Sequence, residues 1–307
     1  MLVDEVLAAL AVRPDGHYVD ATFGRGGHSA RILSELGPDG RLVAVDRDPD
    51  AIASGQARFA SETRLTLVHG AHGELAALLR AADPHQTLYD GILFDCGVSS
   101  PQLANAARGF SFQQDGPLDM RMDPRCGQPV SEWLARAARE EMRDVIATLG
   151  EERFARRIAS AIEAERATRP LIRTAQLAEL VARAVPRHEP GKHPATRTFQ
   201  ALRMWVNDEL GQLRRALPQA VELLRPGGRL ALISFHSLED AVVRDFLAQR
   251  SSVDPALARL PVVPAAAQPQ LRRIGRKAHA SAAELAANPR ARSALLRCAE
   301  RLGALAP

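Results

Sequence analysis

The stretch DATFGRGGHS, residues 20–29, decides how the first part of the chain folds. It begins at the end of an apolar segment expected as a strand, His17–Thr22, and opens a segment with helical periodicity at 28–36. Glycines in such a turn let the backbone approach a ligand closely, and the following helix offers free N–H donors at its N-terminus. A dinucleotide-binding loop would read G-x-G-x-x-G, whereas Ser29 stands in the third glycine position. The loop by itself predicts either a ligand site or a packing turn.

The residues around this loop alternate between strand and helix patterns. Strand and helix at this spacing predict βαβ units, an α/β fold with a parallel sheet, and right-handed crossovers. Ligands of such sheets bind at the carboxyl ends of the strands. Further strands are expected at Arg41–Asp46, Leu65–His69 and Gly91–Asp95, with helices at 2–11, 48–60 and 73–82.

The pattern changes after about residue 104, where helical segments rich in Arg and Glu follow one another without a convincing strand. The helices expected there are Val130–Thr148, Glu151–Glu165 and Thr174–Val185, followed by one helix from Phe199 to Leu224.

The C-terminal part is expected to resume the sheet. A turn at Arg225-Pro-Gly-Gly228 leads to a strand at Arg229–Phe235, and Ser293–Glu300 is expected to add an edge strand. Residues 251–290 are rich in Pro and Ala and are expected to form a loop or a poorly ordered segment. This segment contains the basic cluster Arg272, Arg273, Arg276 and Lys277.

Composition sets the outer limits on function. A chain of 307 residues with 46% hydrophobic and 25% charged residues is long enough for two domains and excludes whole-chain disorder. No apolar run approaches a membrane span, and the N-terminus carries acids where a signal peptide would be basic, so we expect a cytoplasmic protein. The three cysteines lack zinc-site spacing, and no metal is expected. The net charge of +4 permits a polyanionic partner, although 38 of the 40 basic residues are Arg, a bias that genome composition alone can produce.

Two of the strands expected beyond the glycine loop end in an aspartate. Asp46 ends LVAVD, where an acid accepts hydrogen bonds from ribose hydroxyls in both nicotinamide and S-adenosyl-L-methionine enzymes. Asp95 precedes a Gly- and Pro-containing turn, which puts polar groups where a transferable methyl group and an amine acceptor would meet. A hydride-transfer site would more usually contain a His or Lys. These features favour a methyltransferase over a nicotinamide-dependent oxidoreductase.

Several long runs resemble one family, the bacterial MraW (RsmH) methyltransferases, which methylate N4 of a cytosine in the decoding region of 16S ribosomal RNA. The resemblance covers nearly the whole chain. The runs are Asp20–Ser29, Ala44–Ala51, Asp95–Leu103, Arg108–Pro124, Gly150–Ile158, His193–Asn207, Ser234–Asp240 and Asn288–Ser293. The resemblance implies a class I, Rossmann-like methyltransferase sheet at 1–103 and 206–307, with a helical substrate-recognition insertion at 104–205.

The same resemblance implies S-adenosyl-L-methionine as cofactor and 16S ribosomal RNA in the small ribosomal subunit as partner, with the oligomeric state left open. His72 stands where the family usually has Phe, and an imidazole can still stack on adenine. Cys96 replaces the usual Leu, and family sequences normally begin with several more residues than precede Leu2 here. The implied cofactor-binding residues are Gly24, Gly26, Gly27, His28, Asp46, His72, Asp95 and Gln102.

Methyl transfer is an in-line displacement, so the enzyme must hold donor and acceptor in line. A cytosine amine is a poor nucleophile because its lone pair is delocalised, and hydrogen-bond acceptors can localise it. We expect Asp95 and the following turn, with Ser99, Ser100 and Pro101, to provide those acceptors. A non-catalytic RNA-binding protein that keeps the cofactor as a structural ligand is the other alternative to an active enzyme.

The target base must leave its stack or be presented in distorted RNA. Basic and aromatic residues of the insertion are candidates for phosphate contacts and base stacking, with core packing as the alternative for the aromatics. Beyond the insertion, His236 is a further candidate, and Ser237 with Asp240 is equally consistent with a helix cap. The insertion's candidates are His193, Arg197 and Phe199, with Phe110 and Phe112.

Overall fold

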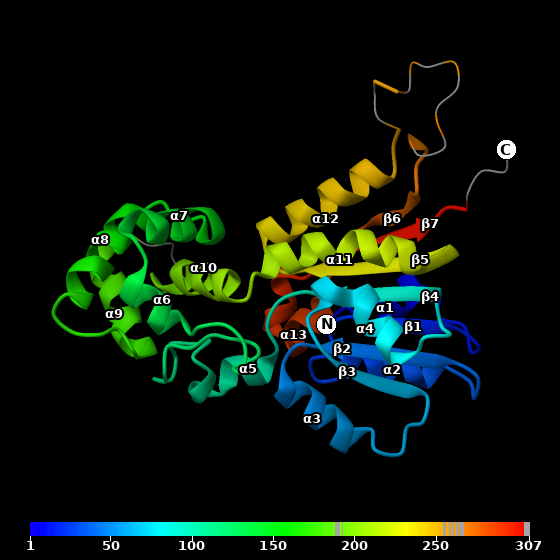
Figure 1. Cartoon of the computed structure of the whole chain (residues 1–307), viewed down its shortest axis with the longest axis horizontal. Helices are drawn as coiled ribbons and strands as arrows, with labels where there is room; N and C mark the ends of the chain where they lie inside the picture. The colour runs from blue at the N-terminus through cyan, green and yellow to red at the C-terminus, as the bar shows by residue number, and fades with distance from the viewer. Residues whose placement is uncertain are drawn as a thin grey trace. The chain divides into compact units, whose positions relative to one another are not determined.

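The chain divides into two compact units in the computed structural model (Figure 1). Unit 1 comprises Met1–Gly97 and Leu210–Pro307, and unit 2 comprises Val98–Glu209. The structure describes residues 1–187, 191, 193–253, 256–257, 259, 261, 264 and 267–303. Within these residues, every helix is too short or too polar to cross a membrane.

Unit 1 is built on a seven-stranded sheet with the order β3-β2-β1-β4-β5-β7-β6. Strands β1 to β5 pair in parallel, and β7 runs antiparallel to both β5 and β6. The chain order reverses between β1 and β4, which is where α/β sheets bind ligands. The α/β, Rossmann-like fold class expected from the sequence is confirmed. The strands are β1 (His17–Asp20), β2 (Arg41–Asp46), β3 (Leu65–His69), β4 (Tyr89–Asp95), β5 (Leu224–Ser234), β6 (Leu271–His279) and β7 (Leu295–Arg301).

Helices cover both faces of this sheet because the inner strands are apolar on both sides. In β4, Ile92 and Phe94 pack on one face while Leu93 packs on the other, and all three are fully buried. Burial of each such side chain contributes roughly 1.5–3 kcal/mol. One face is covered by α4 (Leu75–Ala82), α11 (Glu209–Leu223) and α12 (Ser237–Arg250), and the other by α1 (Val3–Leu10) and α2 (Gly27–Glu35). Unit 1 also contains α3 (Pro49–Arg58), η1 (His72–Glu74), α13 (Ala282–Ala287) and η4 (Pro289–Ser293).

Unit 2 is helical around a core of its own. Its described residues contain one isolated β-bridge, Pro117 to Arg173, and no strand. Trp133 and Trp205 stack with ring centroids 4.1 Å apart beside buried aliphatic side chains such as Ile146 and Leu177. The elements are α5 (Ser100–Ala104), η2 (Ala106–Arg108), α6 (Val130–Arg136), α7 (Arg139–Gly150), α8 (Ala155–Arg166), α9 (Thr174–Ala184) and α10 (Thr196–Val206).

Two helices expected as continuous are interrupted. The single helix expected at 130–148 is wrong, because the backbone is extended at Ala137 and Ala138. The Arg166 guanidinium donates to the carbonyls of Leu134 and Ala137 at 2.6 and 2.7 Å, which satisfies acceptors at the end of α6.

The single helix expected at 199–224 is also wrong. It ends at Val206, and Asp208 adopts a positive φ of 48° before α11 begins. The buried Asn207 side chain accepts a hydrogen bond from the Met122 N–H at 2.8 Å and donates to the Met120 carbonyl at 2.7 Å. These tertiary hydrogen bonds hold the chain in its break.

Three expectations for the C-terminal part are corrected. Strand β5 already begins at Leu224, so the Arg225-Pro-Gly-Gly228 segment is a bulge within it, where Tyr89 aligns with Leu224 and Gly91 with Arg229. The loop expected across 251–290 contains β6, which includes the basic cluster, and α13. The strand expected at the edge, β7, lies between β5 and β6, so β6 is the edge.

Candidate active site

Three carboxylates gather at the carboxyl ends of the parallel strands: Asp20 ends β1, Asp46 ends β2 and Asp95 ends β4. Asp20 is 1% exposed. Its Oδ2 accepts a hydrogen bond from Ser29 Oγ at 2.7 Å, and its Oδ1 accepts one from the Thr22 N–H at 3.2 Å. Burial raises the pKa of Asp20 to about 6, since removal from water penalises the charged form.

The glycine loop is joined to the end of β2 by hydrogen bonds. The Gly24 N–H donates to Asp46 Oδ2 at 2.6 Å, and the Asp48 N–H donates to Oδ1 at 2.8 Å. Gly24 and Gly26 have positive φ angles of 56° and 68°, a conformation that favours glycine. Burial raises the pKa of Asp46 to about 6, against the lowering effect of these two hydrogen bonds.

Asp95 faces the imidazole of His28. The Asp95 N–H donates to Thr22 Oγ1 at 2.6 Å, and Asp95 Oδ2 lies 3.5 Å from His28 Nδ1. Asp95 Oδ1 is buried and has no hydrogen-bond partner among the described residues. Burial raises the pKa of Asp95 to about 6, while the positive charge of a protonated His28 acts in the opposite direction.

The position of His28 fixes which of its nitrogens carries the proton. Its Nε2 lies 2.9 Å from the Met1 carbonyl oxygen, which can only accept, so Nε2 bears the hydrogen. Burial lowers the pKa of His28, so a neutral ring with a lone pair on Nδ1 is favoured. A proton on either His28 Nδ1 or Asp95 Oδ2 would allow a hydrogen bond between the two groups.

His72 lies in η1, just beyond the end of β3. Its ring packs edge-on against Phe94, with centroids 5.8 Å apart, and its Nε2 is buried without a hydrogen-bond partner among the described residues. Burial, together with the charges of Arg47 and Arg215, lowers the pKa of His72 to about 4. The ring is therefore neutral at physiological pH and offers an aromatic surface together with one unused polar atom.

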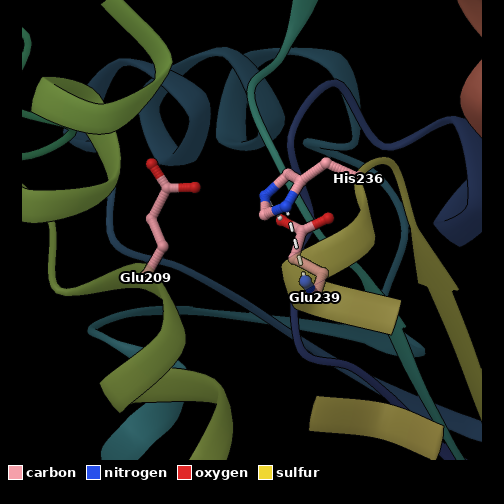
Figure 2. Close-up of side chains that lie close together, drawn as sticks. All are labelled: Glu209, His236 and Glu239. Atoms are coloured by element: carbon pink, nitrogen blue, oxygen red, sulfur yellow. Dashed lines mark hydrogen bonds and ion pairs between the residues drawn. The ribbon is translucent and has the colours of Figure 1, made fainter. Parts of the chain in front are cut away.

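His236 caps α12 next to β5. Figure 2 shows its ring beside Glu239, whose N–H donates to His236 Nδ1 at 3.4 Å, and His236 Nε2 lies 3.1 Å from Glu239 Oε1. The capping role weighed for Ser237 is wrong, because His236 is the N-cap. Glu209, drawn in the same view, belongs to unit 2 and pairs with Arg203 at 2.8 Å.

The residues expected after Asp95 belong to unit 2. Ser99 is the N-cap of α5, Ser100 and Pro101 form its first turn, and Gln102 Oε1 accepts a hydrogen bond from the Ser99 N–H at 2.8 Å. Gln102 is 7% exposed, so this capping box holds it tightly within its own helix.

Two of the insertion's candidates for RNA contact, His193 and Phe199, pack against a third, Phe112. The His193 ring lies 4.6 Å from Phe112, and Phe199 meets Phe112 edge-on at 4.9 Å, measured between centroids. Phe199 is 4% exposed and belongs to the core of unit 2, so the packing alternative describes its position. The Arg197 guanidinium donates to the Glu151 carbonyl.

The structure thus brings the expected residues of unit 1 to one edge of its sheet, and those of unit 2 to α5 and to the surroundings of Phe112. Sequence reasoning gave no role to Asp20, Thr22 or Ser29, although all three lie in or beside the glycine loop. A polar residue at the end of a buried strand, with a hydroxyl one helical turn into the next helix, is the signal that marks Asp20 and Ser29.

This donor and acceptor set fits a nucleoside that carries a positive charge. The Asp46 carboxylate suits ribose hydroxyls, His72 offers an aromatic face, and Asp95 Oδ1, which has no partner among the described residues, suits an ammonium or amine hydrogen. The fold and the position of these residues at the switch point of the sheet are typical of α/β enzymes that bind nucleosides.

Comparison with known proteins identifies the family of this chain. The model of the MraW methylase family matches residues 1–302, and the chain belongs to this family. Its cofactor is S-adenosyl-L-methionine. Proteins named ribosomal RNA small subunit methyltransferase H are 56% identical in Thiobacillus denitrificans and 54% identical in Dechloromonas aromatica. Each alignment covers 98% of this chain, and 96% and 97% of the respective relatives.

A solved structure, a putative methyltransferase from Streptococcus mutans in complex with SAH, is similar over 98% of both chains, with 11% sequence identity and a TM-score of 0.45. This likeness is too slight to support an inference.

Proposed function

We propose that this methylase transfers a methyl group to N4 of a cytosine in the decoding region of 16S ribosomal RNA, acting on the small ribosomal subunit in the cytoplasm. The names of its relatives support the substrate class. The observation that carries the proposal is Asp95: a partly buried carboxylate at the end of β4 whose buried Oδ1 has no hydrogen-bond partner among the described residues.

Unit 1 residues hold the cofactor in this proposal. Asp46 accepts hydrogen bonds from the ribose hydroxyls. The glycine loop at Gly24, Gly26 and Gly27 lets the protein backbone approach the cofactor closely. The His72 ring stacks on the adenine or borders it. His28 and Gln102 complete the set that the family resemblance implies. Bound S-adenosyl-L-methionine supplies an electrophilic methyl group, and the chain's own residues supply position and proton acceptance.

Asp95 performs two tasks for an amine substrate. As a carboxylate it accepts a hydrogen bond from the cytosine amine, which localises the lone pair on N4. N4 must lose one proton when it gains a methyl group, and Asp95, with its pKa raised to about 6, can take that proton. His28 Nδ1, 3.5 Å away, then shares it. Ser99, Ser100 and Pro101, which follow in the chain, are proposed as further acceptors for the amine.

RNA contacts are proposed at His193 and Arg197 in unit 2 and at His236 in unit 1. Phe199 supports this surface from behind, because it is buried against Phe112, whose other neighbour is the His193 ring. Phe112, which is partly buried, is the aromatic residue here that is available to a base.

The proposal is tested by transfer of labelled methyl from S-adenosyl-L-methionine to small ribosomal subunits from a strain that lacks this activity. Nucleoside analysis then separates N4-methylcytosine from C5-methylcytosine. We expect label in the N4 product. Label in C5-methylcytosine would overturn the proposed amine chemistry, and binding of RNA and cofactor without transfer would favour a non-catalytic role.

Two variants sharpen this test. Asp95→Ala should abolish transfer and leave the circular dichroism spectrum unchanged. Asp39→Asn is the matched control, since Asp39 is exposed in the loop before β2, at the opposite end of that strand from Asp46. Transfer by the Asp95→Ala variant at the control rate would remove Asp95 from the chemistry.

A further inference from the structure

The outermost strand of the sheet in unit 1 has an unusual charge. Strand β6, Leu271–His279, carries Arg272, Arg273, Arg276 and Lys277 and no acidic residue, and all four basic residues are exposed. The four charges equal the net charge of +4 of the whole chain. Figure 1 shows β6 next to β7 at the margin of the sheet. We call β6 the basic edge strand.

A bulge turns part of this strand away from regular pairing. Ile274 aligns with Cys298 and Ala278 with Leu296, so three residues of the basic edge strand face a single residue of β7. Gly275 opens the bulge with a positive φ of 64°. Arg276 and Lys277 are the other two bulged residues, which increases the local twist and separates their side chains from the regular ladder.

Neighbouring acids leave much of this charge uncompensated. Glu300 pairs with Arg272 and also with Arg229, the latter at 2.9 Å. Asp240 is engaged by two hydrogen bonds from Arg297, at 2.7 and 3.0 Å, and Lys277 adds only a long-range attraction to it. Within the described part of the chain, Arg273 and Arg276 form no ion pair.

Protection of a sheet edge explains only part of this pattern. One or two charges and a bulge suffice to block edge-to-edge pairing. A second copy of the chain is a poor occupant, because two basic edge strands side by side would bring like charges together. Exposed, unpaired guanidinium groups along an extended strand suit phosphates at successive positions of an RNA backbone.

We propose that the basic edge strand binds backbone phosphates of the RNA substrate, away from the target base, through Arg273, Arg276 and Lys277. This rests on the proposed function, in which the substrate is ribosomal RNA. The contact increases affinity for RNA of any sequence and takes no part in methyl transfer, since phosphate contacts position a nucleic acid without reading it.

The test compares two double variants of the full chain. Arg273→Ala/Arg276→Ala removes two unpaired arginines of the basic edge strand. Arg80→Ala/Arg214→Ala removes two exposed arginines from α4 and α11 that have no ion pair among the described residues, and it serves as the control. Binding of fluorescently labelled 16S ribosomal RNA is measured from low to moderate salt, and adenosylhomocysteine binding is measured by calorimetry.

We expect the basic edge strand variant to bind RNA about 10-fold more weakly at low salt, and to lower the slope of log affinity against log salt by about 1.5. Adenosylhomocysteine binding should be unchanged in both variants. A slope equal to that of the control variant would overturn the inference. Dimers that form only in the basic edge strand variant, detected by light scattering, would also overturn it in favour of edge protection.

The wild-type protein separates this inference from the proposed function. If the wild type binds and methylates small-subunit RNA while both double variants retain the wild-type salt slope, only the basic edge strand is excluded. If the wild type fails to bind or methylate that RNA, the proposed substrate is wrong. The reversal Arg276→Glu should weaken RNA binding more than Arg276→Ala, and equal binding by these two variants would contradict a phosphate contact.

Discussion

Three buried or partly buried carboxylates distinguish the candidate site of this methylase at the scale of single residues. Asp20, Asp46 and Asp95 all have pKa values raised to about 6 by burial, yet each occupies a different hydrogen-bonding environment. Both oxygens of Asp20 accept hydrogen bonds from residues in or beside the glycine loop. Each oxygen of Asp46 accepts a hydrogen bond from a backbone N–H. Only Asp95 among the three has an oxygen without a partner in the described residues, which singles it out for the chemistry.

Methyl transfer should depend on pH through Asp95. Because its pKa is about 6, the carboxylate is protonated as the pH falls through that value, and one acceptor oxygen is lost. We expect kcat/KM to decline below pH 6, and Asp95→Asn to lower it by at least about 100-fold at pH 7.5. Single-turnover methyl transfer between pH 5 and 8 measures this. A rate that stays level across the range would exclude Asp95 as the ionised acceptor.

Asp20 should instead affect stability. Its pKa is about 6 in the folded protein and 3.8 when the side chain is exposed in the unfolded chain, so between these pH values the folded state retains a proton that the unfolded state loses. The free energy of unfolding therefore falls as the pH rises through this window, by up to about 3 kcal/mol. Asp20→Asn should lack this loss, and urea unfolding at pH 4 and pH 7 measures the difference. Parallel pH dependence of the variant and wild type would contradict it.

His72 carries a polar atom that its surroundings do not use. Phe retains the edge-on packing against Phe94 and removes the buried Nε2, whose lack of a partner costs about 1–3 kcal/mol. We expect His72→Phe to raise the melting temperature of the protein without ligand, and His72→Ala to lower it because the ring contact is lost. Differential scanning calorimetry compares them. A lower melting temperature for His72→Phe would show that Nε2 has a partner after all.

At the scale of elements, two neighbouring positions of the glycine loop differ in the space they leave for a side chain. A Cβ at Gly26 would lie 2.7 Å from the Phe23 ring and 2.9 Å from Phe59, and the φ there is positive. A Cβ at Gly27 would meet nothing within 4 Å. Gly26→Ala should therefore cost about 1–3 kcal/mol of stability and Gly27→Ala much less. Chemical denaturation of both variants tests this, and equal losses would refute the steric account.

The elements that sequence predicted well are those with local signals. The ranges of β2 and β3 match the expectation because apolar runs there are bounded by turn residues. The sequence predicts a loop where β6 lies, because its basic residues and Gly275 do not form a local strand pattern. The strand is defined by its pairing with β7, which sequence periodicity does not reveal. Likewise, periodicity alone does not reveal the breaks near Ala137 and Asn207, since side chains distant in the sequence satisfy the freed backbone groups.

In the candidate site, too, features with a local sequence signal were predictable and features that depend on tertiary contacts were not. Asp46 and Asp95 were placed correctly at strand ends, because a carboxylate that closes an apolar strand is visible in the sequence. The pairing of His28 with Asp95 was not predicted, since it requires the register of β1 against β4 and the position of α2. The assignment of roles to these residues stays a prediction.

At the scale of the whole molecule, the two tryptophans of the chain lie in the same unit. Trp133 and Trp205 stack in unit 2, whereas the proposed cofactor-binding residues from Gly24 to Asp95 lie in unit 1. Tryptophan fluorescence thus reports on unit 2 alone, and hydrogen exchange of β1 and β4 reports on unit 1.

Adenosylhomocysteine should stabilise unit 1 more than unit 2. At 100 times its Kd, a ligand that binds only the folded state adds about 2.7 kcal/mol. We expect slower hydrogen exchange in β1 and β4, with a smaller upward shift of the thermal transition seen by tryptophan fluorescence. Equal stabilisation by both probes would show that the two units unfold as one cooperative body.

The interrupted sheet also has a consequence for synthesis on the ribosome. Strand β4 leaves the exit tunnel early, but its partner β5 follows only after all of unit 2. Residues 96–223 intervene, about 130 residues, so at 5–20 residues per second the wait lasts roughly 6–26 seconds. During that time β4, apolar from Ile92 to Phe94, is an open edge on a nascent half-sheet. The fold of this methylase thus creates a period during synthesis in which its central strand lacks the neighbour that pairs with it in the finished sheet.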